Sequence, residues 1–214
     1  MKAFVKNKIF PVIFFRSIIQ GWSLLITLCF LGCASNSKKI VERFYLLESR
    51  SYPKKEGYKK MTYPQIVISA IRLPSYLDRP QIVGIMGGNQ LTFSERERWG
   101  DNLKRNIARV MRRNLMANFP HATIEAVPHY QRGKDSLFLS IEITSFAFDA
   151  GLGKVKLEAI WSLEKDNQSR KTYTDYISFP LGESKDTERI VSKMSDCLAE
   201  LSNKIATTIE DFCL

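Results

Sequence analysis

Histidine and the common catalytic motifs are scarce in this sequence. Only two of the 214 residues are histidine, His121 and His129, and neither has Cys, Asp or Glu near it at a spacing typical of a metal site. The chain has no G-x-S-x-G nucleophile elbow. The segment Gly151-Leu-Gly153 lacks the strand–turn–helix context of a phosphate-binding loop. We therefore expect a protein that is not an enzyme and that holds no metal and no catalytic cofactor.

Cysteine is also rare, with four residues in the chain. Cys197 and Cys213 lie on what the periodicity predicts to be one helix, sixteen residues apart (213 minus 197). That separation is roughly 24 Å of helical rise, whereas a disulfide needs Cα atoms within about 7 Å. The two residues cannot pair within that helix, and we interpret them as small buried hydrophobic residues.

The N-terminal segment has the composition of an export signal. Lys2, Lys6 and Lys8 precede an apolar stretch over 9–32, which ends in Phe30-Leu31-Gly32-Cys33. This ending resembles the lipobox of bacterial lipoproteins, in which a signal peptidase cuts before a lipid-carrying cysteine. The resemblance implies a signal peptide over 1–32 and an N-acyl diacylglycerol on Cys33, which would hold the protein on a membrane. Such proteins usually carry Asp after the cysteine when they stay in the inner membrane. Ala34 stands there, so we expect the outer membrane, with the domain facing the periplasm.

An uncleaved transmembrane anchor is the alternative for this segment. The uninterrupted stretch over 17–32 has 16 residues, roughly 24 Å of helix, which is short of a hydrocarbon core of about 30 Å. A longer helix starting at Ile9 would place Arg16 inside the bilayer, at a cost of roughly 2.5–3.5 kcal/mol. The lipoprotein hypothesis avoids both difficulties.

The remaining chain has 182 residues (214 minus 32), which suits one domain with a real core. We predict a lipidated tether over 33–43 and a single α+β domain over 44–214. The predicted signal peptide holds four of the 32 basic residues and none of the 22 acidic ones, so the mature net charge is +6. This moderate charge is not typical of a nucleic-acid-binding protein.

Hydrophobic periodicity predicts strands followed by a helix, then strands and a second helix. The expected strands cover 44–47, 65–73, 81–93 (with a kink at Gly87-Gly88), 123–127, 136–148, 155–163 and 171–179, and the expected helices cover 94–118 and 186–212. Ser94 and Glu97 form a capping-box pattern at the start of the first helix. This order is typical of an α+β fold, an antiparallel sheet with two long amphipathic helices packed on one face.

The first predicted helix has two contrasting faces. Trp99, Leu103, Ile107, Val110, Met111 and Leu115 form its apolar face, and Lys104, Arg105, Arg109, Arg112 and Arg113 form a basic face. The basic face either keeps the helix soluble or binds anionic lipid headgroups. The last helix carries a long apolar stripe, which at this spacing is typical of core packing.

The segment 73–83 sets Pro74 and Pro80 on either side of an aromatic, an aliphatic and a charge pair. The two prolines restrict the backbone, so the side chains between them lose little entropy on binding. A partner-binding surface made of Tyr76, Leu77, Asp78, Arg79 and Gln81 is one interpretation. A rigid corner with Tyr76 and Leu77 tucked beneath it is the other.

The same segment carries a family resemblance. LPSYLDRPQIV over 73–83, RERWGDNLKRNIARVMRRNL over 96–115 and FYLL over 44–47 are similar to blocks of the ABC-type transport auxiliary lipoproteins, the PqiC-like group. The resemblance implies a non-enzymatic envelope component. It would work with an MCE-domain periplasmic protein and inner-membrane transporter subunits that move lipids between membranes. The sequence leaves the oligomeric state open, a homo-oligomer included.

Three hypotheses about function follow. In the first, an outer-membrane lipoprotein docks the periplasmic MCE protein. In the second, a lipid-binding shuttle holds a phospholipid in its own cavity, lined by Trp161, Phe146, Phe148 and Ile160. The third, a hydrolase, would need a polar constellation that the sequence does not present.

Overall fold

The computed structural model describes residues 41–50, 65–126, 136–165, 170–182 and 186–213, which belong to one compact unit, Val41–Leu214. The predicted signal peptide, Cys33 and most of the predicted tether lie outside these residues. So do His129 and residues 166–169, which join the strands expected at 155–163 and 171–179.

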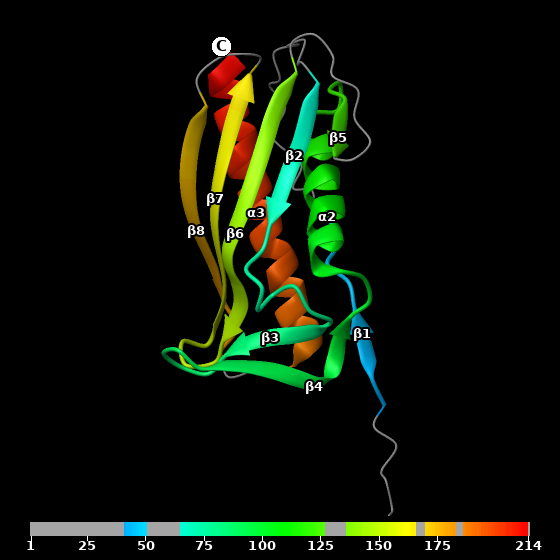
Figure 1. Cartoon of the computed structure of the whole chain (residues 1–214), viewed down its shortest axis with the longest axis vertical. Helices are drawn as coiled ribbons and strands as arrows, with labels where there is room; N and C mark the ends of the chain where they lie inside the picture. The colour runs from blue at the N-terminus through cyan, green and yellow to red at the C-terminus, as the bar shows by residue number, and fades with distance from the viewer. Residues whose placement is uncertain (1–40, 51–64, 127–135, 166–169, 183–185, 214) are drawn as a thin grey trace, which may run out of the picture. The chain divides into compact units, whose positions relative to one another are not determined.

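The described residues form eight strands and two long helices (Figure 1). The strands are β1 (Arg43–Tyr45), β2 (Ile66–Arg72), β3 (Gln81–Ile85), β4 (Leu91–Trp99), β5 (Ile124–Ala126), β6 (Leu137–Asp149), β7 (Lys154–Lys165) and β8 (Lys171–Pro180). The helices are α2 (Leu103–Asn118) and α3 (Thr187–Cys213). All the strands join in one sheet, and both helices lie against the same face of it (Figure 1). The predicted α+β class is confirmed.

The sheet is mixed, however, and not antiparallel as the sequence suggested. Strands β6, β7 and β8 form the expected antiparallel meander, and β3 pairs antiparallel with β4. Strand β2 instead runs parallel to both β5 and β6, β3 runs parallel to the end of β6, and β1 runs parallel to β4. Alternation of polar and apolar residues reports which face of a strand is buried and is silent on strand direction. Direction here is set by the long crossover from β2 to β6, which contains α2.

The first helix begins at Leu103, not at Ser94, and this corrects the prediction of a helix over 94–118. Residues 94–99 continue β4 through an irregularity between the pairs Val83–Phe93 and Gln81–Arg98. One capping-box contact does form, because the Glu97 amide donates to Ser94 Oγ at 3.0 Å. It closes a turn inside a strand, since β1 and β3 both offer backbone partners to this stretch.

The true N-cap of α2 is Asn102. Its side-chain oxygen accepts a hydrogen bond from the Arg105 amide at 3.2 Å, which satisfies one of the free donors of the first turn. Trp99, assigned from the sequence to the helix, is buried at the end of β4 instead.

The core lies between the sheet and the two helices. It contains the predicted apolar face of α2 from Leu103 to Leu115, alternate residues of β6 and β7, and the stripe of α3 from Ile190 to Ile209. A register shift between Ile143 and Ser145 reverses the alternation of β6, so that Phe146 and Phe148 also point inward. Cys197 is buried within this core, and desolvation raises the pKa of its thiol to about 12. Neither of the described helices is long and apolar enough to cross a membrane.

Candidate functional site

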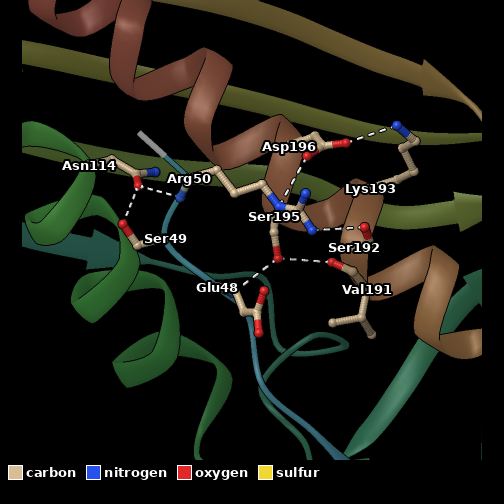
Figure 2. Close-up of polar contacts among 9 residues, drawn as sticks. All are labelled: Glu48, Ser49, Arg50, Asn114, Val191, Ser192, Lys193, Ser195 and Asp196. Carbon is tan, nitrogen blue, oxygen red and sulfur yellow. Dashed lines mark hydrogen bonds and ion pairs between the residues drawn. The ribbon is translucent and has the colours of Figure 1, made fainter. Parts of the chain in front are cut away.

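The segment Glu48–Arg50 crosses between the two helices and is held there by polar side chains from both (Figure 2). The Glu48 amide donates to Ser195 Oγ at 3.0 Å. On the other side, Asn114 Oδ1 accepts from Ser49 Oγ at 2.9 Å and from the Arg50 amide at 3.0 Å. We call this segment the strap. It links α2 and α3 by hydrogen bonds beside their apolar contact.

An ion cluster fastens the end of the strap to α3. Arg50 Nε lies 3.2 Å from Asp196 Oδ1, and Arg50 Nη2 donates to Ser192 Oγ at 2.8 Å. Lys193 Nζ lies 2.9 Å from the other oxygen of Asp196, whose side chain is only 8% exposed. The carboxylate thus lies between two cations (Figure 2). Lys193 donates to Asp196 Oδ2, whereas Asp196 Oδ1 and Arg50 Nε are buried and make no hydrogen bond, so their contact is an ion pair only. With a cation on each side, the carboxylate is placed to hold the strap.

The residue pattern along the chain did not predict this cluster. Asn106 and Asn114 lie eight residues apart on the apolar face of α2, and both are buried. Two asparagines on a buried helix face require polar partners, and this is the signal that could have predicted a crossing segment. Ser195 and Asp196 lie among the apolar residues of α3 and are buried. Because this helix is buried on more than one side, its periodicity does not separate these polar residues from the core.

A groove of about 490 Å³ opens beside the strap, between β1 and the first half of α3. Its lining combines Phe44, Tyr45 and Leu46 with Glu48, Arg50, Glu188, Val191, Ser192 and Ser195. A second groove of about 440 Å³ lies between β8 and the second half of α3. There Trp161 stacks on Tyr173 with centroids 4.4 Å apart and donates to Asp175 at 2.8 Å. Both linings mix polar and apolar groups, which suits contact with a protein or lipid headgroup better than storage of an acyl chain.

Replacing Arg50 by alanine is expected to lower the free energy of unfolding by about 1–3 kcal/mol, because a buried carboxylate loses one of its partners. Chemical denaturation of the variant and the parent measures this. Arg189→Ala is the control, because it removes an exposed arginine from α3, the helix that carries Asp196. It should change stability by less than about 0.5 kcal/mol. Equal stability of all three proteins would show that the cluster does not hold the strap.

The two-proline segment turns the chain between β2 and β3. Leu77 is 1% exposed and belongs to the core, so it is not available to a partner, and this corrects its place in the predicted binding surface. Tyr76 is partly buried, and its hydroxyl donates to the Thr144 carbonyl at 3.2 Å. Burial raises the pKa of Tyr76 above its usual value. The burial of Leu77 and the partial burial of Tyr76 therefore agree with the rigid-corner interpretation.

The two charged residues of this corner are braced by contacts with other side chains. Asp78 is exposed and accepts from Asn102 Nδ2 at 3.1 Å, which ties the corner to the start of α2. The Arg79 guanidinium lies over the Phe93 ring, 4.2 Å from its centroid. Gln81 is half-buried at the start of β3. The corner thus presents a fixed polar surface around the buried Leu77, made of Tyr76, Asp78, Arg79 and Gln81.

The basic face of α2 divides into two groups. Arg109 donates to the Leu47 carbonyl at 2.6 Å, and Arg112 donates to the Ile124 carbonyl at 2.9 Å, so these two brace neighbouring segments. Arg105 is exposed and pairs with Asp101, and it lowers the pKa of that carboxyl. Lys104 and Arg113 are exposed. A contact with anionic lipid headgroups, if α2 makes one, rests on these exposed residues.

Reversing Lys104 and Arg113 to glutamate is expected to leave the melting temperature unchanged, because both side chains are exposed. If this face binds anionic headgroups, binding to phosphatidylglycerol vesicles should weaken and lose part of its salt dependence. The comparison is made in a Cys33→Ser background, so that a lipid anchor cannot mask it. Arg72→Glu with Arg189→Glu, on β2 and α3, is the control. If both double variants lost vesicle binding equally, the effect would be due to net charge alone.

Candidate metal ligands do not cluster within the described residues. No group of three or more His, Cys, Asp or Glu side chains that could hold a metal ion is found there. His121 is exposed beyond the end of α2.

The fold is an α+β domain in which two helices cover one face of a mixed sheet. Over residues 45–206 the sequence matches the family model of the ABC-type transport auxiliary lipoprotein component. The chain belongs to this family. It is therefore an auxiliary, membrane-anchored lipoprotein of the cell envelope that works with an ABC-type transport system.

Two solved structures share the fold. An uncharacterized protein is 17% identical, with a TM-score of 0.65 over 79% of this chain and 99% of its own. Protein XCC0632 of Xanthomonas campestris, of the family DUF330, is 16% identical, with a TM-score of 0.61 over 78% of this chain and 95% of its own. A PelC dodecamer of Paraburkholderia phytofirmans is more distant, at 11% identity and a TM-score of 0.39 over 74% of this chain and 94% of its own. No curated protein matches the chain.

Proposed function

We propose that this protein is an outer-membrane lipoprotein that docks the periplasmic MCE-domain protein of an intermembrane lipid transport system, without chemistry of its own. The family match over 45–206 carries the proposal, because it covers almost the whole described domain and ties the protein to ABC-type transport. Lipidation at Cys33 supplies the anchor in this proposal, and inner-membrane transporter subunits complete the assembly.

The docking surface in this proposal is the outward part of the two-proline corner: Tyr76, Asp78, Arg79 and Gln81. The corner is held from beneath by Leu77 in the core and from the side by the hydrogen bond between Asp78 and Asn102. A surface fixed in this way loses little conformational entropy when a partner binds. Arginine and tyrosine are also the residues most often found at energetically dominant interface positions.

The four residues proposed to line the lipid cavity of a shuttle do not lie around one cavity. Trp161, Phe146 and Phe148 are packed in the core. Ile160 is 38% exposed and alternates with Ala159 and Trp161 along β7, so it lies on the opposite face of the sheet. These four residues cannot line one lipid site, and docking is the better supported function.

Replacing Tyr76 by alanine is expected to weaken partner binding by about 2 kcal/mol or more, roughly thirtyfold in Kd. The variant should also melt somewhat earlier, because the ring is partly buried. The measurement is a melt and a pull-down on one preparation, with the periplasmic MCE protein as bait.

Tyr176→Ala is the matched control, because Tyr176 is an exposed tyrosine on β8, away from the corner. It should bind as the parent does. A large drop in melting temperature of Tyr76→Ala with full binding by the folded fraction would make the corner purely structural. Failure of the unaltered protein to bind the bait would remove the docking proposal itself.

A further inference from the structure

Exposed apolar side chains gather at one end of the described domain. Nine large apolar residues are exposed within the described ranges. Six of them lie on or directly beside β1, β3, β4 and the β6–β7 turn: Val41, Phe44, Leu46, Met86, Phe93 and Leu152. These elements form the lower end of the domain in Figure 1, away from the C-terminal end of α3. Scattered apolar residues need no explanation on a protein surface, but a cluster at one end indicates an interaction surface.

Two turns at this end touch each other. The Ala150 amide donates to the Ile85 carbonyl at 2.8 Å. An added Cβ on Gly151 would come within 3.1 Å of the Gly87 Cα, so the β6–β7 turn packs directly on the β3–β4 turn. Met86 and Leu152 project from these two turns and are 57% and 62% exposed. The two turns that carry these exposed apolar side chains therefore lie side by side.

The chain between the predicted lipid and the domain is short. Cys33 precedes Val41 by eight residues (41 minus 33), which can span at most about 29 Å when fully extended. This stretch ends at β1, where Phe44 is 63% exposed. Strand β4 connects the β1 side of this end to the paired turns, and its nine residues are roughly 30 Å long. The described domain thus begins at this end, and a lipid on Cys33 can lie at most about 29 Å from Val41.

We propose that this end of the domain, through Met86, Leu152 and Phe44, inserts into the interface of the bilayer that holds the anchor. The domain then contacts the membrane directly and is not connected to it by the tether alone. Interfacial insertion of apolar side chains to a depth of about 5–10 Å strengthens a lipid anchor and also fixes its orientation. With β1 and the paired turns on the bilayer, the distal end of α3 points away from the membrane. The proposal goes beyond docking of a transport partner and rests on lipidation at Cys33.

Tryptophan reporters test the insertion in the full, lipidated protein. Leu152→Trp, Met86→Trp and Tyr176→Trp are each reconstituted into vesicles of phosphatidylethanolamine and phosphatidylglycerol, with and without a phospholipid brominated near the top of one acyl chain. Bromine quenches only a tryptophan that touches the acyl region. Trp99 and Trp161 are buried in the core and give a constant background, which the unaltered protein measures. Tyr176 is the exposed control on β8.

The expected result is a loss of emission at positions 152 and 86 in brominated vesicles, with no loss at 176. Vesicle-bound protein with no loss at 152 and 86, or with equal loss at all three positions, would overturn the insertion and leave the anchor standing. Protein that does not stay with vesicles at all would remove the anchor and this proposal with it. If Met86→Glu with Leu152→Glu abolished capture by the MCE protein and no quenching were seen, the end would be a protein interface.

Discussion

Replacing Leu201 by alanine is expected to lower the free energy of unfolding by about 2–5 kcal/mol. Leu201 is fully buried in the stripe of α3, and truncation leaves a cavity that the helix and the sheet cannot both close. For a domain of this size, that loss corresponds to a fall in melting temperature of roughly 5–20 °C. Thermal and chemical denaturation of the purified domain measure it.

Met116→Ala is the matched control for this experiment. Met116 is a large apolar residue on a helix as well, but it is exposed on α2. Its loss should change stability by less than about 0.5 kcal/mol. If Leu201→Ala were equally mild, the stripe of α3 would not be core, and an interaction role for that helix would return.

Replacing Cys33 by serine is expected to abolish membrane anchoring. A hydroxyl cannot form the thioether to diacylglycerol, so the variant should lack the lipid mass and remain either an uncleaved precursor or a soluble periplasmic protein. The effect should be large, because each buried methylene of an acyl chain contributes about 0.8 kcal/mol and a mature bacterial lipoprotein carries three chains. Fractionation of cells and mass spectrometry of the recovered protein measure both consequences.

Cys29→Ser tests whether the effect is specific, since Cys29 lies four residues earlier in the same apolar stretch (33 minus 29). It should be processed and anchored as the parent is. Unchanged membrane association and mass in Cys33→Ser would rule out lipidation there and favour the uncleaved transmembrane anchor.

The strap and the core hold the two helices by different physics. Apolar contact between α2 and α3 is non-directional and tolerates sliding, whereas the bonds from Asn114 and Ser195 to the strap fix their relative position. The corner and the apolar end depend on that fixed frame, because Asn102 at the start of α2 braces Asp78 and β1 leads into the strap. Replacing Arg50 should therefore also make the two-proline corner and the apolar end less rigidly positioned.

Local pattern was enough for much of the site. The apolar face of α2, the alternation along β6 and β7 and the stripe of α3 were all readable, because burial imposes the period of the element on its sequence. Pro74 and Pro80 marked a rigid corner by their chemistry alone. The basic residues of α2 were identified as outward-facing, but their roles were not, since the carbonyls that Arg109 and Arg112 reach belong to segments distant in sequence.

The sequence by itself determined the α+β class, the faces of the elements and the family, because these depend on residue type and spacing along the chain. Only the tertiary structure decided strand direction, the late start of α2, the burial of Leu77 and the gathering of Met86 and Leu152 at one end. Each of these depends on which backbone groups and side chains meet across long sequence separations. The Ser94–Glu97 turn shows the point: the Ser94 hydroxyl accepts the Glu97 amide as at the start of a helix, yet pairing with β1 and β3 holds the stretch in a strand.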